Sequence, residues 1–547
     1  MDIQETKIYY TDNIIIGAGP AGIQLAYFFK KHNIEYIQLE KNSYCAGFFE
    51  NFPHSSQLIS INKRFTGKTD QEFNYRHDWN SLLNDEGLLF KDFSKDFYPK
   101  SEDLFKYLNC FVKNNGLKIS FNHEVKLISK IETNTDQLKN EYKYKIEIAN
   151  INKIFYCKKL IIGTGLSLPN IPEFNFNVVN KVRHYADFPR NFFKEQVNLE
   201  KYENKRVLII GSGNSAFELA NILNNYCSNI IILGSSNNMS IISHYAGDLR
   251  SINLPFLDTF YLKTMNGLDV LSKIDRNVLS IVQNNLPNDP NYLKYQLLNN
   301  KGLYFSSTDL EYFDDIILCT GWKFNTNIFN FNLDMVNNNK YPKINYKYES
   351  TNNSDLFFIG SLMHSLDFKK SSGGFIHGFR YLIRFFTQIN FNIDISKKVF
   401  KFDGTLNCYK NLSDYIYNRI NTISSLYQMF GVLVDYFYWD KNEKEIIYIH
   451  DVTYDYILDN IPDTIISFST IKLVYSEEYV YDIRKLGAFD KYNPKFLHPE
   501  ISIIEKYDSK WNLMDKIVLE EDLVADFTGK RFYNKIMRAL KSCPLII

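Results

Sequence analysis

Two glycine-rich turns constrain the fold of this chain more than any other feature of its sequence. The first turn, Gly17–Gly22, follows the apolar run Asn13–Ile16 and precedes a helical pattern that runs to Lys31. The second turn, Gly211–Ala216, follows the apolar run Arg206–Ile210 in the same way. A strand, a glycine turn and a helix form the start of a βαβ unit. Two such starts, 194 residues apart, therefore predict two doubly wound modules in one chain.

The glycines of the first turn have the spacing of a dinucleotide site. In such a turn the first glycine allows the tight bend, the second lets the backbone approach a pyrophosphate, and the third allows close packing of helix on strand. A carboxylate at the end of the next strand can accept hydrogen bonds from ribose hydroxyls. Glycine turns that serve only packing also occur, but strand, helix and acid together favour nucleotide binding. The residues predicted to bind the cofactor here are Gly17, Gly19, Pro20, Ala21, Gly22 and Glu40.

The second turn predicts a second dinucleotide site, through Gly211, Gly213, Asn214 and Ser215. At the position where the first module has its acid, the second has Gly234. No carboxylate there repels a 2′-phosphate and no arginine holds one, so NADPH and NADH both remain possible cofactors. The alternative is a module that keeps the fold without binding a nucleotide.

Two buried strands end in glycine turns where the chain could cross between the modules. One is Lys159–Gly165 and the other is Asp315–Gly321, so Gly165 and Gly321 are added to the predicted cofactor residues. Before the first crossing, Leu117–Val125 and Tyr144–Ala149 have the residue pattern of short strands.

A third glycine-ended strand, Asp355–Gly360, comes after both modules. Gly374 and Phe375 then open a helical pattern that runs to Phe386. The positive end of a helix at this place could stabilise negative charge on a reduced cofactor ring. We therefore predict that Gly360, Gly374 and Phe375 contact the cofactor, although the glycines before the helix could also simply end a loop.

The bulk composition excludes several classes of function. Lys and Arg total 63 and Asp and Glu total 62, so no net positive field attracts nucleic acid. No run of about 18 uncharged apolar residues predicts a transmembrane helix, and the charged start of the chain does not have the pattern of a secretory signal. The seven cysteines lie at least 47 residues apart, which argues against a disulfide framework or a metal site. We expect a cytoplasmic protein with reduced thiols.

Longer motifs outside the glycine turns are spread over nearly the whole chain, at Leu58–Lys68, Phe73–Leu83, His244–Arg250, His364–Arg380, Leu426–Phe430 and Phe496–Pro499. Motifs of this length are more specific than a glycine turn. Through them the chain resembles the flavin-containing monooxygenase superfamily, and within it the FAD-dependent oxidoreductase domain-containing proteins.

This resemblance implies bound FAD and its reduction by NADPH or NADH. In the wider monooxygenases an asparagine at the position of Asn62 helps to hold the flavin and the nicotinamide cofactor, so the resemblance makes Asn62 the candidate catalytic residue. From the residues alone, Asn62 could equally cap a turn between Leu58 and Gly67.

The superfamily fingerprint FxGxxxHxxxF is only half present. His184 and Phe188 fit it, whereas Val178 and Asn180 replace the aromatic residue and the glycine. Three functions therefore remain open: a monooxygenase, a flavin reductase or oxidase without oxygen insertion, and a non-enzymatic flavoprotein that binds protein partners. The partner is then a small-molecule substrate or another protein, and not nucleic acid.

The predicted fold class is α/β, with two Rossmann-like dinucleotide-binding domains and a C-terminal α+β region. We expect an FAD domain from residues 1–168 and 316–395, with an NAD(P) domain at 169–315 inserted into it. Residues 396–547 form the third region, for which the sequence indicates no chemistry. The polar run Asn74–Asn80 is predicted to be mostly a solvated loop.

Overall fold

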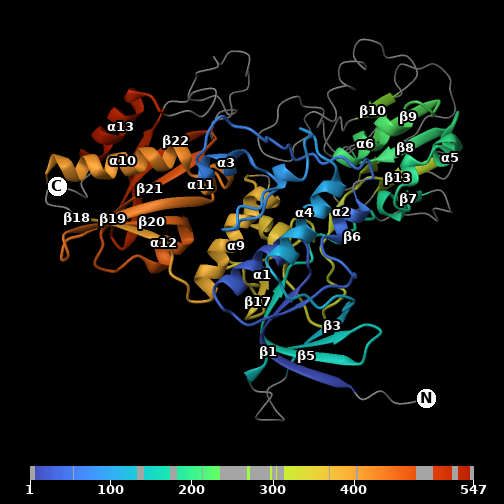
Figure 1. Ribbon diagram of the computed structural model, residues 1–547, viewed down its shortest axis with the longest axis horizontal. Coiled ribbons are helices and arrows are strands. Elements are labelled where there is room, and N and C mark those ends of the chain that lie inside the picture. Colours follow the sequence, from blue (N-terminus) through green and yellow to red (C-terminus); the bar gives the residue numbers. More distant parts are fainter. Residues whose placement is uncertain are drawn as a thin grey trace.

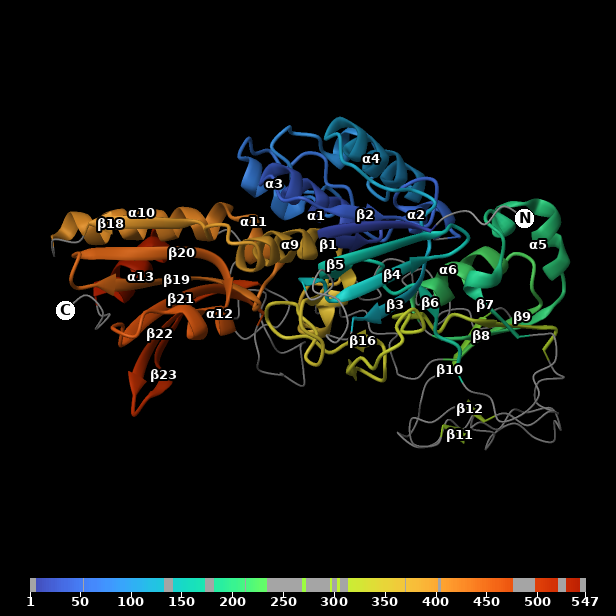
Figure 2. The same cartoon turned by 90° about the horizontal axis from the view of Figure 1, so that it is seen from below.

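Three sheets lie one after another along the long axis of the computed structural model, with the first sheet in the middle, the second at one end and the C-terminal sheet at the other (Figures 1 and 2). The structure describes residues 6–52, 54–131, 141–172, 182–211, 213–233, 268–271, 296–297, 303–304, 313–368, 370–401, 405–475, 497–519 and 528–541.

The first sheet has six strands, in the order β2-β1-β5-β4-β3, with β17 also paired to β5. Its central strand β5 changes partner along one edge. Ile154–Cys157 pair antiparallel with β4, and Leu160–Ile162 pair parallel with β17. The late strand β17 thus joins the module begun by the first glycine turn, as the sequence predicts. The strands are β1 (Lys7–Ile16), β2 (Ile37–Leu39), β3 (Val125–Lys130), β4 (Tyr144–Ile148), β5 (Lys153–Ile162) and β17 (Leu356–Phe358).

Helices α1 (Pro20–Lys31), α4 (Ser101–Asn114) and α9 (Ile376–Asn390) cover this sheet, and α1 contacts both of the others (Figure 2). Proline at the first position of α1 costs no hydrogen bond, because the first backbone N–H groups of a helix have no partner within it. Helix α1 is buried from Ala21 to Phe29, and its mostly apolar sequence allows this burial. Two short helices, α2 (Gly47–Asn51) and α3 (Gln71–His77), lie in the long connection after β2.

The second sheet is parallel throughout, in the order β10-β9-β8-β13-β7. Residues 316–318 belong to it, because β13 pairs with β8 on one edge and β7 on the other, so this sheet extends three residues past the predicted module boundary at 315. Its elements are β7 (Val182–His184), α5 (Gln196–Leu199), β8 (Arg206–Ile210), α6 (Asn214–Leu223), β9 (Asn229–Leu233), β10 (Leu268–Leu271) and β13 (Asp315–Leu318).

A two-stranded antiparallel ribbon joins the two modules. It pairs β6 (Leu168–Pro169), where the chain leaves the first module, with β14 (Trp322–Lys323), where it returns. Next to the ribbon, the backbone N–H of Asn170 donates to the carbonyl oxygen of Gly321 at 2.9 Å. Two further short antiparallel pairs join β11 (Gln296–Leu297) with β12 (Leu303–Tyr304) and β15 (Met335–Val336) with β16 (Tyr341–Pro342).

The C-terminal region contains a six-stranded antiparallel sheet in the order β18-β20-β19-β21-β22-β23, with α10 packed against α13. Its elements are β18 (Lys397–Lys401), α10 (Leu406–Thr422), α11 (Ser424–Gln428), β19 (Leu433–Asp440), β20 (Glu445–Thr453), α12 (Tyr454–Asn460), β21 (Ser467–Val474), β22 (His498–Tyr507), β23 (Lys510–Val518) and α13 (Lys530–Lys541).

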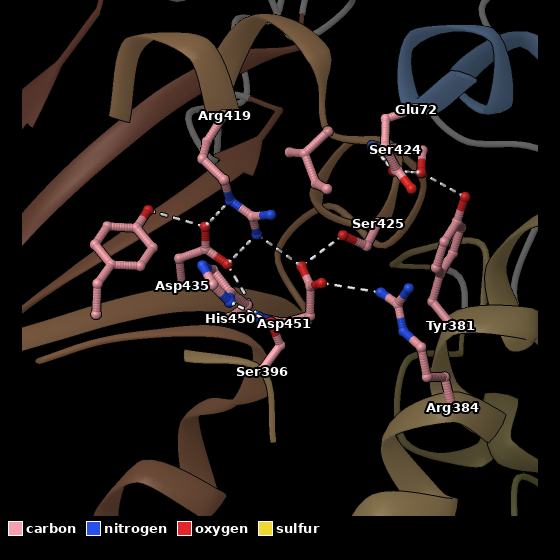
Figure 3. A network of polar contacts seen from close by, with 12 residues as sticks. Glu72, Tyr381, Arg384, Ser396, Arg419, Ser424, Ser425, Asp435, His450 and Asp451 are labelled. Carbon is pink, nitrogen blue, oxygen red and sulfur yellow. Dashed lines mark hydrogen bonds and ion pairs between the residues drawn. The ribbon is translucent and has the colours of Figure 1, made fainter. Parts of the chain in front are cut away.

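A buried ionic network attaches this region to α9 (Figure 3). The Arg419 guanidinium donates to both carboxylate oxygens of Asp435 at 2.7 Å and to Asp451 at 3.2 Å. Asp451 also accepts hydrogen bonds from Ser425 and from Arg384, which lies on α9. Buried charges of this kind are tolerated only when they are paired and hydrogen bonded.

Helix α3 makes a second attachment to the C-terminal region. Arg76 is 1% exposed and donates to the carbonyl oxygens of Ile423 at 2.9 Å and Ile420 at 2.5 Å. The prediction of a solvated loop at Asn74–Asn80 is therefore wrong. The first four residues are helical, none of the seven is exposed, and Asn80 is buried as deeply as Arg76. No helix among the described residues is long and apolar enough to cross a membrane.

Candidate nucleotide-binding sites

The three glycines of the first turn occupy three different environments. A Cβ atom on Gly17, whose φ is +100°, would lie 2.8 Å from the carbonyl oxygen of Gly163, and one on Gly22 would lie 2.1 Å from that of Gly17. A Cβ on Gly19 would meet no described atom within 4 Å. Gly17 and Gly22 thus make the turn and its packing possible. Gly19 leaves open space at the N-terminus of α1, where backbone N–H groups can hold an anion.

Glu40 directly follows β2, beside this turn, and is buried. One of its carboxylate oxygens accepts the backbone N–H of Ala18 at 2.7 Å. The other accepts two hydrogen bonds from Asn42, from the backbone N–H at 2.9 Å and from the side-chain amide at 2.8 Å. Since a carboxylate offers about four acceptor positions, one remains for a ribose hydroxyl.

A cavity of about 310 Å³ lies at the carboxyl ends of β1, β2 and β5. In open α/β sheets this is the position of the nucleotide crevice. The predicted residues Gly17, Gly19 and Glu40 line it together. Sequence reasoning missed most of the remaining wall, which includes Phe48, Phe52, His123, Thr164 and Trp322.

The segment after β17 approaches the start of α1 from the other side. Gly360 has a φ of +72°, and a Cβ atom on it would lie 2.4 Å from the Cβ of Ala21. Gly165, with a φ of +65°, faces the same segment, because its Cβ would lie 3.3 Å from the hydroxyl oxygen of Ser361. Predicted residues from three distant parts of the sequence thus meet around one turn.

The second glycine turn repeats this design. A Cβ atom on Gly211, whose φ is +113°, would lie 2.2 Å from the carbonyl oxygen of Cys319, whereas one on Gly213 would meet no described atom within 4 Å. Gly321, after β13, has a φ of +79°, as Gly165 has a positive φ after β5. Gly234 lies outside the described residues.

Asn214 and Ser215 begin α6 directly after the second turn. The side-chain oxygen of Asn214 is buried and has no hydrogen-bond partner among the described residues. Buried polar atoms are normally satisfied, so an orphan acceptor at this place fits a missing ligand or water. The donors and the open glycine position of this turn fit a second dinucleotide.

A carboxyl group lies at the junction of the two modules. The Ser55 hydroxyl, from the first module, donates to Glu218 of α6 at 3.1 Å. Burial raises the pKa of Glu218 to about 7, and the hydrogen bond from Ser55 opposes part of this shift. The sequence alone does not show that Glu218 is partly buried, because a glutamate on a helix is usually exposed.

Asn62 is not among the residues that line the cavity. Its side-chain amide donates to the carbonyl oxygens of Ser94 at 2.9 Å and Asp96 at 3.2 Å, and its backbone N–H donates to Phe97 at 2.8 Å. Both amide hydrogens are therefore used within the protein. This geometry favours a structural role for Asn62 over a cofactor contact.

The cysteine nearest the first cavity has no catalytic features. Burial raises the pKa of the Cys45 thiol to about 12, and this thiol donates to the side-chain oxygen of Asn109 at 2.9 Å. A thiol with so high a pKa is a poor nucleophile. Among the described residues no three His, Cys, Asp or Glu side chains are arranged to hold a metal ion.

A family model described as pyridine nucleotide-disulphide oxidoreductase matches residues 14–360, so the chain belongs to this family. It is 33% identical over 459 residues to FAD-dependent oxidoreductase domain-containing protein 2 of Mus musculus, which confirms the resemblance seen in the sequence. The match covers 81% of this chain and 66% of the mouse protein, so the chain spans about two thirds of that relative.

More distant similarities extend to monooxygenases. Over 234 residues the chain is 24% identical to the probable indole-3-pyruvate monooxygenase YUCCA7 of Arabidopsis thaliana, which covers 42% of this chain and 48% of that protein. A solved flavin-containing monooxygenase from Stenotrophomonas maltophilia is 15% identical, covers 69% of this chain and 98% of that one, and has a TM-score of 0.48.

Proposed function

We propose that the first glycine turn binds FAD, that the second binds NADPH or NADH, and that the protein is an oxidoreductase that moves hydride equivalents between them. One observation carries the proposal. In both turns the first glycine is packed against a neighbouring carbonyl group, while the next, Gly19 or Gly213, opens onto free space at a helix N-terminus. Packing alone does not require that second glycine.

In this proposal the backbone at Gly19, together with the N–H groups of Ala21 and Gly22, holds the FAD pyrophosphate, and Glu40 accepts a ribose hydroxyl. Gly213 and the start of α6 hold the nicotinamide dinucleotide in the same way. FAD, when bound, accepts two electrons from a nicotinamide and passes them to an acceptor. The FAD module then consists of residues 1–168 and about 319–395, and the nicotinamide module consists of residues 169 to about 318.

For the acceptor we propose a monooxygenase-like reaction, in which molecular oxygen takes the electrons and a small molecule is oxygenated. The name of the Arabidopsis relative supports this reaction. The second candidate is a reductase or oxidase without oxygen insertion, and the internal hydrogen bonds of Asn62 favour it. A reductase that relays electrons through its own cysteine pair is disfavoured, because no two cysteines are close in sequence and Cys45 is a buried thiol. Residues 396–547 remain candidates for binding a protein partner.

Two matched variants test cofactor assignment. Gly19→Val should purify without FAD, because the new side chain fills the space needed by the pyrophosphate, yet should keep its affinity for the nicotinamide dinucleotide. Gly213→Val should keep its FAD but lose reduction by NADPH or NADH. Each variant is the control for the other, and flavin absorbance with rapid-mixing reduction measures both. Full flavin content in Gly19→Val would refute the first site.

Oxygen consumption during NADPH or NADH turnover separates the two candidate reactions. If all the oxygen consumed appears as hydrogen peroxide, whatever small molecule is added, the protein is an oxidase. Product formed in proportion to the nicotinamide oxidised identifies a monooxygenase. Fast reduction of an added acceptor without oxygen uptake identifies a reductase.

A further inference from the structure

A buried histidine and aspartate form a hydrogen-bonded pair after β17. His364 Nδ1 lies 2.9 Å from one carboxylate oxygen of Asp367, and both residues are almost fully buried. The other oxygen of Asp367 accepts the backbone N–H of Gly373 at 2.9 Å. A carboxylate can only accept hydrogen bonds, so Nδ1 carries the hydrogen and Nε2 is the nitrogen left to exchange protons.

Two adjacent glycines make room for this pair. A Cβ atom on Gly373 would lie 2.5 and 2.6 Å from the two carboxylate oxygens of Asp367, and one on Gly374 would lie 3.0 Å from the ring of His364. Neither glycine has a positive φ, so the backbone conformation does not explain them. From the sequence these glycines could end a loop or contact the cofactor. In the structure they leave room for the side chains of Asp367 and His364.

The pair follows the segment that packs against the first glycine turn. His364 lies on the 3₁₀ helix Gly360–Ser365, which has three residues per turn, so Ser361 and His364 share one face. Ser361 is the residue whose hydroxyl faces the turn at Gly165, and Gly360 lies against the first turn of α1. His364 is therefore one turn further along the segment that packs against Ala21 and Gly165.

The surroundings leave Nε2 of His364 free. This nitrogen has no hydrogen-bond partner among the residues that the structure describes. The rings of Tyr341 and Phe368 lie 6.2 and 5.5 Å from the imidazole. Besides Asp367, the titratable groups around it are Tyr341 and Lys340, whose ammonium group lies over the rings of Tyr341 and Phe368.

We propose that His364 is the acid–base residue of the FAD site and that Asp367 positions it; this inference rests on the proposed function. Hydride transfer from a nicotinamide carries two electrons and one proton, so complete reduction of an isoalloxazine ring needs one more proton. His364 supplies it: the Nε2–H bond of the imidazolium breaks, the ring becomes neutral, and solvent later restores the proton. The Asp367 carboxylate accepts the hydrogen bond from Nδ1 and holds the imidazole ring in one orientation.

His364→Gln and Asp367→Asn test the proposal in the full-length protein, and His32→Gln at the exposed C-terminus of α1 is the matched control. We expect His364→Gln to keep its FAD and its melting temperature. Its rate of flavin reduction by NADPH or NADH should fall about a hundredfold, the usual contribution of general acid–base catalysis. Asp367→Asn should show a smaller loss, and His32→Gln none.

Histidine ¹⁵N NMR of the wild-type protein gives a readout that does not depend on turnover. We expect the hydrogen to lie on Nδ1 of His364 in the wild-type protein and to be shared between the Nδ1–H and Nε2–H forms in Asp367→Asn. A wild-type His364 without a hydrogen on Nδ1, or a His364→Gln protein reduced as fast as wild type, overturns the inference. Wild-type protein without FAD, or with FAD that NADPH and NADH fail to reduce, overturns the proposed function instead.

Discussion

Gly211 lies against the carbonyl group of Cys319 so closely that a Cβ atom would come within 2.2 Å of its oxygen. Gly17 has the same relation to Gly163, at 2.8 Å. In each module the glycine turn after one strand is thus packed against the end of the neighbouring parallel strand. The two modules therefore pack the first glycine of the turn in the same way, and in both the next glycine faces open space.

Gly211→Ala should destabilise the second module. The positive φ alone costs an alanine about 1–3 kcal/mol, and the contact with Cys319 adds to it. Gly213→Ala is the control, since its Cβ meets no described atom and its φ is not positive. Urea unfolding of both variants measures the difference. Equal stabilities of the two variants would contradict the packing described here.

Glu218 should make stability depend on pH. Burial raises its pKa from the ordinary 4.5 to about 7 in the folded protein. Between these values the folded state binds more protons than the unfolded state, so the free energy of unfolding falls as pH rises through this window. Glu218→Gln can still accept the hydrogen bond from Ser55 but cannot ionise. We expect it to remove this slope and to be more stable than wild type above about pH 7, in denaturation series at several pH values. A variant with the wild-type slope would show that another group titrates.

Arg419→Leu should destabilise the attachment of the C-terminal region. It leaves the carboxylates of Asp435 and Asp451 buried without their main cation, which costs about 3–5 kcal/mol. In the double variant Arg419→Leu with Asp435→Leu, part of the stability should return, because one unpaired charge is gone. Chemical denaturation measures all three proteins. If the single variant were as stable as wild type, the network would not hold the region in place.

Asn62→Ala distinguishes its two interpretations. In the structural interpretation the carbonyl oxygens of Ser94 and Asp96 lose their donor, which costs about 1–3 kcal/mol if they stay unsatisfied, while FAD binding and flavin reduction are unchanged. Thermal unfolding and rapid-mixing spectra measure these effects. Unchanged stability together with altered oxygen chemistry would instead assign Asn62 to the cofactor site.

The glycine turns could be predicted from the sequence because the strand, turn and helix pattern around them is local. The contacts that require Gly17 and Gly211 are with Gly163 and Cys319, which are distant in the sequence, and only the contact of Gly22 with Gly17 lies within the turn itself. The return of β17 to the first sheet was predictable as well, because an apolar strand that ends in a glycine needs buried neighbours.

Features that depend on distant contacts could not be predicted. Leu117–Val125 looks like a strand, but β3 begins only at Val125, since the preceding residues connect α4 to it. Arg76 looks solvated until the carbonyl groups of Ile420 and Ile423 are placed over it. Gly373 and Gly374 gain their meaning from His364 and Asp367, whose side chains occupy the space above them.

The ribbon of β6 and β14 has a consequence for how such a chain can be taken apart. Trp322 pairs with Pro169 and Lys323 with Leu168, so the two ends of the intervening 152 residues, 170–321, are held side by side. A short turn across this ribbon could replace the whole insertion and leave the strands of the first sheet uninterrupted. The segment is in effect a cassette, and a shortened protein that still carried FAD would be a minimal flavin scaffold onto which other electron donors could be grafted.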